Sequence, residues 1–415
     1  MMESPFKTVE KKEENLVSQK DLLIYYSEHY PSKLIINWLC RNNIKLIKNR
    51  EFCFTLPNDE YNDKYVRFQS FETIKQFENR IKKLIPIKID IGAIYDIEPR
   101  NRAEHKLDSD LFFQEKELVF DIDMKDYDDV RTCCKENNIC DKCWKYIICG
   151  AKILDKILKE DFGFKKYFFD FSGRRGIHCW VCDKKACKLK DEGRKMIENF
   201  ISFDRVNDEF TNSFFNRRII KRKFVDPIYP SFLEEISLIK NDFDVILKEQ
   251  DLLNYGDIKK LFKDIIKMYF GWMDMKEIDD ILKKKINSLD KFNDIYEYLK
   301  KAENMSKKRN IILYYRSESC INEFILSVIS PRLDWKVTRE SAHLLKGPFC
   351  VHPKTGYVSV PMSLKLLEKF DLRKIPKIDN LINKNPDDIE YFKQYRQFFE
   401  NFVNSLNNNE EEEDE

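Results

Sequence analysis

The periodicity of apolar residues changes twice along the chain, and this change limits the folds that the sequence can adopt. Strand-like segments recur in the first half, at 88–95, 117–124, 167–171 and 177–182. Between about 203 and 310 only amphipathic helical patterns remain, and strand character returns at 333–337 and 349–360. The pattern therefore predicts a mixed α/β (α+β) domain that is discontinuous in sequence and carries an inserted all-helical domain.

Shorter signals refine this division. Helical spacing on both sides of Pro31 predicts a helix pair, residues 51–71 read as a hairpin, and 151–159 as a helix. Asn385 followed by Pro386 has the form of a helix cap. The expected parts are a polar arm (1–19), a first α/β part (20–205), a helical insert (206–310), a second α/β part (311–385), and a terminal helix with an acidic tail (386–415).

Charge and hydropathy exclude several classes of protein. The chain has 74 Lys and Arg against 72 Asp and Glu, for a net charge of +2, so only local basic clusters could bind a polyanion. No apolar run approaches the ~20 residues of a membrane span, and the first twenty residues lack the apolar core of a signal peptide. We therefore expect a soluble, non-secreted protein without a membrane partner, with its cysteines reduced.

Two acidic residues on one predicted strand are the first candidate site. Leu118, Phe120 and Ile122 alternate with polar positions, so Asp121 and Asp123 fall on one face. Carboxylates at this spacing can converge on a pair of Mg²⁺ ions. Taken alone, the motif is weak, and an edge strand that exposes two acids to solvent is the more common reading.

A glycine-flanked arginine pair is the second candidate site, within a predicted strand–turn–strand. The chain has only 10 glycines, and two of them enclose the paired arginines, which favours close backbone approach and forked donors to a phosphate. An ordinary hairpin tip is the alternative. The residues concerned are Ser172, Gly173, Arg174, Arg175, Gly176 and His178.

A third segment, from Arg332 to Gly356, gathers one acid, two histidines and several lysines. Asp334 could complete a metal site, and Lys346 and His352 could hold a triphosphate. Each of these residues is also common in simple turns, so the segment alone leaves both readings open.

Four cysteines follow the aspartate strand within 133–143. Cys140 and Cys143 have the spacing of a zinc knuckle, and Cys133 and Cys134 precede them. The group predicts a closed structural zinc site, with free buried thiols as the alternative.

Together these segments resemble the DNA primase small-subunit family of archaea and eukaryotes, and the eukaryotic form in particular. The resemblance also includes Glu51, Tyr65, Arg67, the segment Lys88 to Ala93, and Asp161 to Phe164. It covers 20–205 and 310–362, whereas the helical insert matches only in position and character. It implies a prim fold of two small sheets and a nucleotidyltransferase that makes short RNA primers de novo on single-stranded DNA.

The same resemblance implies roles for individual residues. Asp121, Asp123 and Asp334 match the triad that binds two Mg²⁺ or Mn²⁺ ions, and Glu51 matches an acid associated with activity. The cysteines match a structural zinc site at Cys133, Cys134, Cys140 and Cys143. The positions that match the nucleotide pocket are Ser172, Gly173, Arg174, Arg175, Gly176, His178, Arg332, His343, Lys346, His352, Tyr65 and Arg67.

Partners follow from the resemblance as well: ribonucleoside triphosphates, a single-stranded DNA template, a primase large subunit and the DNA polymerase alpha complex, all in the nucleus. The sequence departs from the family pattern at Asp170, which replaces an aromatic or small residue, and at Arg339 and Glu340. Two other readings stay open, a repair-type polymerase of the same fold and a non-catalytic nucleic-acid-binding assembly subunit.

Overall fold

The structure is a computed structural model that describes residues 17–41, 43–57, 64–101, 112–202, 230–307 and 316–406. Most of the predicted polar arm, the start of the helical insert, and the acidic tail from 407 onward lie outside the described residues, as does the turn expected at Asn58 and Asp59.

The first sheet, sheet A, is antiparallel and has the order β2-β1-β3-β4, with β8 also paired to β3. Its strands are β1 (Arg50–Leu56), β2 (Lys64–Gln69), β3 (Lys88–Tyr95), β4 (Phe113–Glu115) and β8 (Leu345–Lys346). The predicted hairpin is confirmed, because Phe54 pairs with Val66 across β1 and β2. The second α/β part of the sequence therefore contributes one strand to the first sheet.

The second sheet, sheet B, is also antiparallel and has the order β5-β7-β6-β9. Its strands are β5 (Leu118–Asp123), β6 (Tyr167–Phe171), β7 (Gly176–Val181) and β9 (Val360–Met362). Asp121 pairs with His178, which in turn pairs with Asp170, so the three residues form a row on one face of the sheet.

One face of sheet B is divided into an aromatic half and a polar half. Trp180 on β7 lies on the same face as His178 and packs edge-on against Trp38, with ring centroids 5.2 Å apart. Trp38 also contacts Phe168 and Phe399, at 5.4 and 5.5 Å. This apolar cluster closes one half of the face, and the polar row is left beside sheet A.

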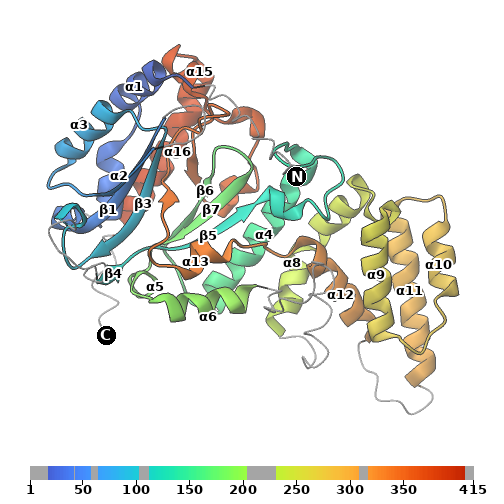
Figure 1. Cartoon of the computed structure of the whole chain (residues 1–415). Coiled ribbons are helices and arrows are strands. Elements are labelled where there is room, and N and C mark those ends of the chain that lie inside the picture. Colours follow the sequence, from blue (N-terminus) through green and yellow to red (C-terminus); the bar gives the residue numbers. More distant parts are fainter. Residues whose placement is uncertain are drawn as a thin grey trace, which may run out of the picture.

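Helices surround the two sheets (Figure 1). The opposite face of sheet B is covered by α4, where Trp144 packs on Phe171 with centroids 5.8 Å apart.

The terminal helix begins as predicted, because the Asn385 side chain accepts from the N–H groups of Asp387 and Asp388. The helices are α1 (Gln19–Glu28), α2 (Ser32–Leu39), α3 (Ile74–Leu84), α4 (Asp141–Glu160), α5 (Lys184–Cys187), α6 (Asp191–Ile201), α13 (Trp335–Arg339), α14 (Leu364–Leu367), α15 (Ile378–Ile382) and α16 (Pro386–Ser405). Short 3₁₀ helices are η1 (Ile44–Asn49), η2 (Pro99–Asn101), η3 (Met124–Tyr127) and η6 (Leu372–Lys374).

A separate helical part extends to one side of the α/β part (Figure 1). It contains α8 (Pro230–Glu249), η5 (Leu252–Asn254), α9 (Gly256–Tyr269), α10 (Lys276–Lys283), α11 (Ser288–Lys307) and α12 (Arg316–Ile329). The helices run past the expected boundary at 310, because Phe324 of α12 stacks on Phe262 of α9 with centroids 4.1 Å apart. None of the described helices is long and apolar enough to span a bilayer.

Three local expectations differ from the structure. The helix predicted at 151–159 begins at Asp141, because the Cys140 and Cys143 side chains cap its first turn. The strand expected at 333–337 is wrong; the segment forms α13, whose first turn is capped by the Asp334 side chain. In the segment 349–360 the expected strand is reduced to an isolated bridge between Val351 and Val358, ahead of β9.

Candidate active site

Three aspartates lie together at the edge of sheet B. Asp121 and Asp123 are on β5, the outermost strand, and point to the same face because one residue separates them. Asp334 comes from far along the chain: Leu333 bridges Ile122, and the N–H of Asp334 donates to the carbonyl oxygen of Asp121 at 3.1 Å. The backbone thus gathers the predicted metal ligands in one place.

The charge of this group is poorly compensated at its centre. Burial, together with the nearby carboxylates of Asp123 and Asp334, raises the pKa of Asp121 to about 8. Asp123 is held by two donors, the N–H of Lys125 at 2.8 Å and Nε of Arg175 at 2.6 Å. Carboxylates crowded in this way fit a divalent cation, which would neutralise them and which prefers oxygen ligands.

The predicted glycine turn joins β6 to β7. The N–H of Ser172 donates to the carbonyl oxygen of Gly176 at 2.9 Å, and Gly173 has a φ of +86°. A Cβ atom at Gly173 would lie 2.9 Å from Cβ of His352, and one at Gly176 would lie 2.6 Å from the carbonyl oxygen of Ile122. Both positions therefore require glycine, because a side chain at Gly173 would collide with the His352 loop and one at Gly176 with the aspartate strand.

Positive charge is concentrated between the glycine turn and sheet A. Lys346 of β8 is buried, and its Nζ donates to the carbonyl oxygen of Ser172. Burial, followed by the charges of Lys346 and Arg174, lowers the pKa of His352 to about 3. Burial also lowers the pKa of Lys346. This pocket favours a bound polyanion, because a phosphate group would relieve the repulsion among its cations.

His178 occupies the centre of the polar row. Its Nε2 lies 3.9 Å from Oδ1 of Asp121, and its Nδ1 lies 3.8 Å from Oδ2 of Asp170. Burial, with the charge of Lys346, lowers the pKa of His178 to about 3, so the imidazole is neutral at pH 7. A neutral ring offers one donor and one acceptor to a ligand.

Asp170 belongs to this site although the motifs did not single it out. It is fully buried, its Oδ2 accepts from the Ser359 hydroxyl at 2.6 Å, and burial raises its pKa to about 7. Asp170 lies two strands from Asp121 in sheet B. In the sequence it stood out only as a departure from the family pattern. Strand register, which pairs Asp170 with His178, is the signal that assigns it.

Besides Lys346 on β8, three of the predicted residues lie on sheet A. Glu51 is buried in β1, and its Oε1 accepts from Nε and Nη2 of Arg67 on β2, at 3.2 and 3.0 Å. The Tyr95 hydroxyl is 3.4 Å from its Oε2. Tyr65 on β2 is 65% exposed. Glu51 is thus an anchored carboxylate that orients Arg67, and Arg67 and Tyr65 lie at the outer strand.

Arg332 faces the 3₁₀ helix η3 and not the cationic pocket. It forms an ion pair with Asp129, and its guanidinium lies over the ring of Tyr127, 4.8 Å from the centroid. The Tyr127 hydroxyl in turn accepts from the N–H of Arg332 at 3.2 Å. These contacts fix the segment that delivers Asp334.

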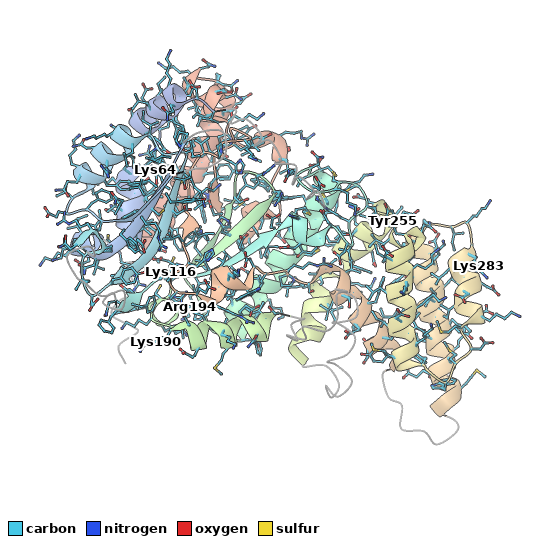
Figure 2. All side chains as sticks on the ribbon, in the orientation of Figure 1. Lys64, Lys116, Lys190, Arg194, Tyr255 and Lys283 are labelled. Carbon is cyan, nitrogen blue, oxygen red and sulfur yellow. The ribbon has the colours of Figure 1, made fainter. Side chains whose placement is uncertain are left out.

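His343 lies where the two sheets meet, close to a pair of buried cations. Its carbonyl oxygen accepts from Nζ of Lys116, and the carbonyl oxygen of Lys116 accepts from Nη2 of Arg194 at 2.6 Å. Lys116 and Arg194 lie near one another in Figure 2. Burial, with the charge of Arg194, lowers the pKa of Lys116 to about 7.

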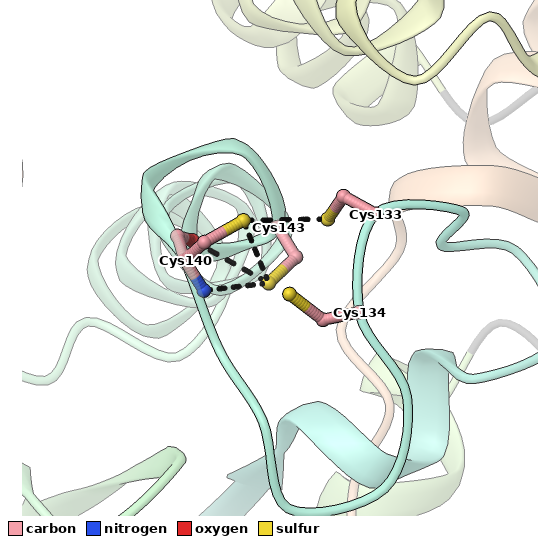
Figure 3. Close-up of side chains that lie close together, drawn as sticks. All are labelled: Cys133, Cys134, Cys140 and Cys143. Carbon is pink, nitrogen blue, oxygen red and sulfur yellow. Dashed lines mark hydrogen bonds between the residues drawn. The ribbon is translucent and has the colours of Figure 1, made fainter.

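The four cysteines converge, as Figure 3 shows. The Sγ atoms of Cys133 and Cys140 are 3.5 Å apart, and those of Cys140 and Cys143 are 3.9 Å apart. All four sulfurs, including that of Cys134, lie within 4.8 Å of one another. In the part of the chain that the structure describes, this is the one group of at least three His, Cys, Asp or Glu residues whose ligand atoms come so close together; the carboxylates of Asp121, Asp123 and Asp334 are spaced more widely. The cluster can hold one metal ion.

Two buried side chains support the cysteine cluster. Nε2 of Gln250, the residue after α8, donates to Sγ of Cys133 at 3.1 Å, and its Oε1 accepts from the N–H groups of Thr132 and Cys133. Nη1 of Arg131 is 3.8 Å from Sγ of Cys143. Gln250 therefore ties the helical part to the cysteine cluster, a contact that the sequence motifs did not reveal.

The sequence of this chain matches those of known proteins. Residues 120–364 match the family described as DNA primase small subunit, which is more than half of the chain. The chain is 35% identical to the DNA primase small subunit of Saccharomyces cerevisiae over 406 residues, 95% of this chain and 93% of that protein. It is 34% identical to that of Schizosaccharomyces pombe, over 91% of this chain and 80% of that protein.

A solved structure of the polymerase domain of Mycobacterium tuberculosis ligase D in complex with DNA is a weak structural match, with a TM-score of 0.37 and 9% identity. It covers 92% of this chain and 89% of that chain. The sequence similarity is much higher, and the family match runs through the aspartate strand, the glycine turn and the segment that carries Asp334. The chain belongs to the DNA primase small-subunit family.

Proposed function

We propose that this chain is the catalytic subunit of a DNA primase, a nucleotidyltransferase that synthesises short RNA primers de novo on single-stranded DNA. The observation that carries the proposal is the meeting of Asp121, Asp123 and Asp334 beside a buried cationic pocket. The names of the relatives support the same activity.

Asp121, Asp123 and Asp334 would hold two Mg²⁺ or Mn²⁺ ions. When bound, such ions lower the pKa of a 3′-hydroxyl and neutralise the leaving pyrophosphate. The raised pKa of Asp121 supports this assignment, because an uncompensated carboxylate beside two others is stabilised by added positive charge.

The cationic pocket would bind the triphosphate of the incoming nucleotide. Arg174 and Lys346 supply charge, and the neutral imidazoles of His178 and His352 supply hydrogen bonds without adding to the repulsion. Arg175, on Asp123, would connect the pocket to the metal ligands. Initiation must order two nucleotides and a template at once, which is entropically costly, and a preformed triphosphate pocket offsets part of that cost.

The cysteine cluster would hold a structural Zn²⁺ ion. Four thiolates around a tetrahedral zinc, with Zn–S bonds of about 2.3 Å, lie about 3.8 Å from each other. The distances of 3.5 and 3.9 Å between sulfurs fit this arrangement. All four sulfurs would then be ligands, so the ion would be structural and have no open position.

A nearly neutral chain binds a template weakly by itself, which favours action with a partner. We propose that the partner is a primase large subunit, and that the two associate with DNA polymerase alpha in the nucleus. These proposals rest on the similarity to eukaryotic small subunits.

The test is de novo RNA synthesis from ribonucleotides on unprimed single-stranded DNA with Mg²⁺ or Mn²⁺, with and without the large subunit. Wild type is compared with the Asp121→Asn, Asp123→Asn double variant. Short RNA products that disappear in the variant support a metal-dependent primase. Equal behaviour of the two folded proteins would favour an assembly subunit, and preferential extension of primers with deoxynucleotides would favour a repair-type polymerase.

A further inference from the structure

An exposed tryptophan follows the third aspartate of the triad in the sequence. Trp335 follows Asp334 and is 39% exposed, whereas Trp38, Trp144 and Trp180 are at most 2% exposed. The backbone of Asp334 is bonded to that of Asp121, so the ring is held one residue from the centre of the proposed active site. A large aromatic surface left open at this position is available to a ligand.

The helix that carries Trp335 is firmly docked, so the exposure of the ring does not come from a loosely packed segment. The Thr338 hydroxyl is buried and donates to the carbonyl oxygen of Val119 on β5 at 2.8 Å. Arg339 donates from Nε to Oε2 of Glu198 on α6 at 2.6 Å, and from Nη2 to Oδ1 of Asn199 at 2.7 Å. Figure 1 shows α13 between β5 and α6. Trp335 is thus presented by a rigid element.

Cations flank the ring. Nζ of Lys336 and Cζ of Arg339 each lie 5.5 Å from the centroid of Trp335. Arg339 is neutralised by the buried Glu198, whereas Lys336 is an exposed residue at the surface. An exposed aromatic face with an exposed cation at its side is the combination that binds single-stranded nucleic acid, with a base on the ring and a phosphate on the cation.

We propose that Trp335 is a stacking platform for an unpaired nucleobase at the catalytic centre, with Lys336 contacting the adjoining phosphate. This inference rests on the proposed primase function and adds a contact to the reacting nucleic acid. The base can come from the template strand, from the incoming nucleotide or from the primer end. All three present the same aromatic face, and the test separates them.

The test measures binding of fluorescently labelled single-stranded DNA, ribonucleoside triphosphate and primer–template to the full chain by anisotropy. We compare Trp335→Ala, Trp335→Phe and Lys336→Ala. Trp335→Ala is expected to weaken at least one of the three by about 5- to 150-fold, the range for loss of one stacked base. Trp335→Phe should retain most of the affinity, and Lys336→Ala should reduce the salt dependence by about one phosphate contact.

Trp272 offers a matched control, because it is 55% exposed and lies in the helical part. Trp272→Ala should bind all three ligands as wild type does, and unfolding temperatures should show that every variant is folded. In a Trp272→Phe background, Trp335 is the one exposed tryptophan that remains in the described part of the chain. The emission of that protein should be quenched by the ligand that stacks on it, and the quenching should be lost on adding Trp335→Phe.

Failure of this inference differs from failure of the proposed function. If Trp335→Ala binds all three ligands as tightly as wild type while the Asp121→Asn, Asp123→Asn protein is inactive, the platform is wrong and the primase assignment stands. If Trp272→Ala weakens binding equally, the effect is not specific to the platform, and the platform is again wrong. If wild type binds the ligands but makes no product with the large subunit, the proposed function fails irrespective of Trp335.

Discussion

Gln250 and Cys133 are joined by a hydrogen bond of 3.1 Å from Nε2 to Sγ, across the junction between the helical part and the cysteine cluster. The same side chain accepts the N–H of Cys133 at 3.1 Å. Gln250 is 3% exposed whereas Cys133 is exposed, so these bonds are partly buried. A contact of this kind orients a metal ligand and also couples two parts of the fold.

Replacing Gln250 by Ala should therefore weaken metal retention. The change removes a donor to the Cys133 sulfur and the acceptor of the Thr132 and Cys133 N–H groups, so we expect a 10- to 100-fold loss in Zn²⁺ affinity. Competition with a chromophoric chelator measures it. Gln397→Ala, on the exposed side of α16, is the matched control and should retain zinc as wild type does. Equal zinc release from the two variants would contradict the prediction.

The aspartate triad predicts a gain in stability on metal binding. Mg²⁺ or Mn²⁺ at ten times its dissociation constant should stabilise the wild type by about 1.4 kcal/mol. The Asp121→Asn, Asp123→Asn protein should lose this response. Without added divalent ion it should be at least as stable as wild type, because the repulsion that raises the pKa of Asp121 is gone. Thermal unfolding over a metal titration is the measurement, and an identical metal response in both proteins would refute the assignment.

The glycine turn predicts that a substitution there weakens both nucleotide binding and the fold. Gly173→Ala places a Cβ atom 2.9 Å from that of His352 at a φ of +86°, a conformation that costs an L-residue about 1–2 kcal/mol. We expect a raised KM for the ribonucleotide and a matching loss of stability. Gly256→Ala, where nothing lies within 4 Å, should be neutral or slightly stabilising. Steady-state kinetics and urea unfolding of the two variants decide the matter.

Variants of the Glu51–Arg67 pair distinguish a structural role of Glu51 from a catalytic one. Arg67→Ala leaves the buried Glu51 carboxylate without its cation, and we expect a loss of about 3 kcal/mol, toward the low end for a buried pair because Arg67 is partly exposed. Adding Glu51→Gln should recover part of that loss. A double-mutant cycle in urea measures the coupling. Should Glu51→Gln alone abolish turnover while stability is unchanged, the acid acts in catalysis.

Asp170 predicts a pH dependence of stability with a definite sign. Its carboxyl has a pKa of about 7 in the folded protein, above the value of about 3.9 in an unfolded chain. The folded state therefore holds more protons, and the stabilisation from Asp170 is present at low pH and lost as the pH rises toward 7. Asp170→Asn should remove its share of this slope between about pH 4 and 7, and the slope from the raised pKa of Asp121 should remain. Asp257→Asn, at an exposed position on α9, should keep it.

Alternation and turn residues were enough to predict most strands and the two hairpins. Phe52 and Phe54 on β1, and Leu118, Phe120 and Ile122 on β5, are buried as their spacing requires. The glycine turn was readable because two of the ten glycines enclose a pair of arginines. The contacts that require glycine there come from His352 and Ile122, which lie far from the turn in sequence. The strands and the turn itself, in contrast, are encoded by neighbours in sequence.

Long-range pairing could not be predicted in the same way. Val337 and Trp335 have strand propensity, but the Asp334 cap and the Thr338 bond to β5 make the segment helical. Asp170 looked like a local irregularity, and only the register of β6 with β7 brings it opposite His178. Contacts from Gln250 to the cysteines and from Lys346 to Ser172 join distant segments through single side chains, which periodicity does not report.

The segment that delivers the third aspartate has a consequence for the order of folding. Arg332 bonds to Tyr127, which lies 205 positions earlier in the chain, and the helical part is formed from that span. During synthesis on a ribosome, β5 leaves the exit tunnel long before Asp334 is translated, so the proposed active site can assemble only after the whole helical part has emerged. Closing so long a loop makes this contact a late, high-contact-order event. Truncated nascent chains that end before Asp334 would thus contain the cysteine cluster and two of the three aspartates, and be unable to start a primer.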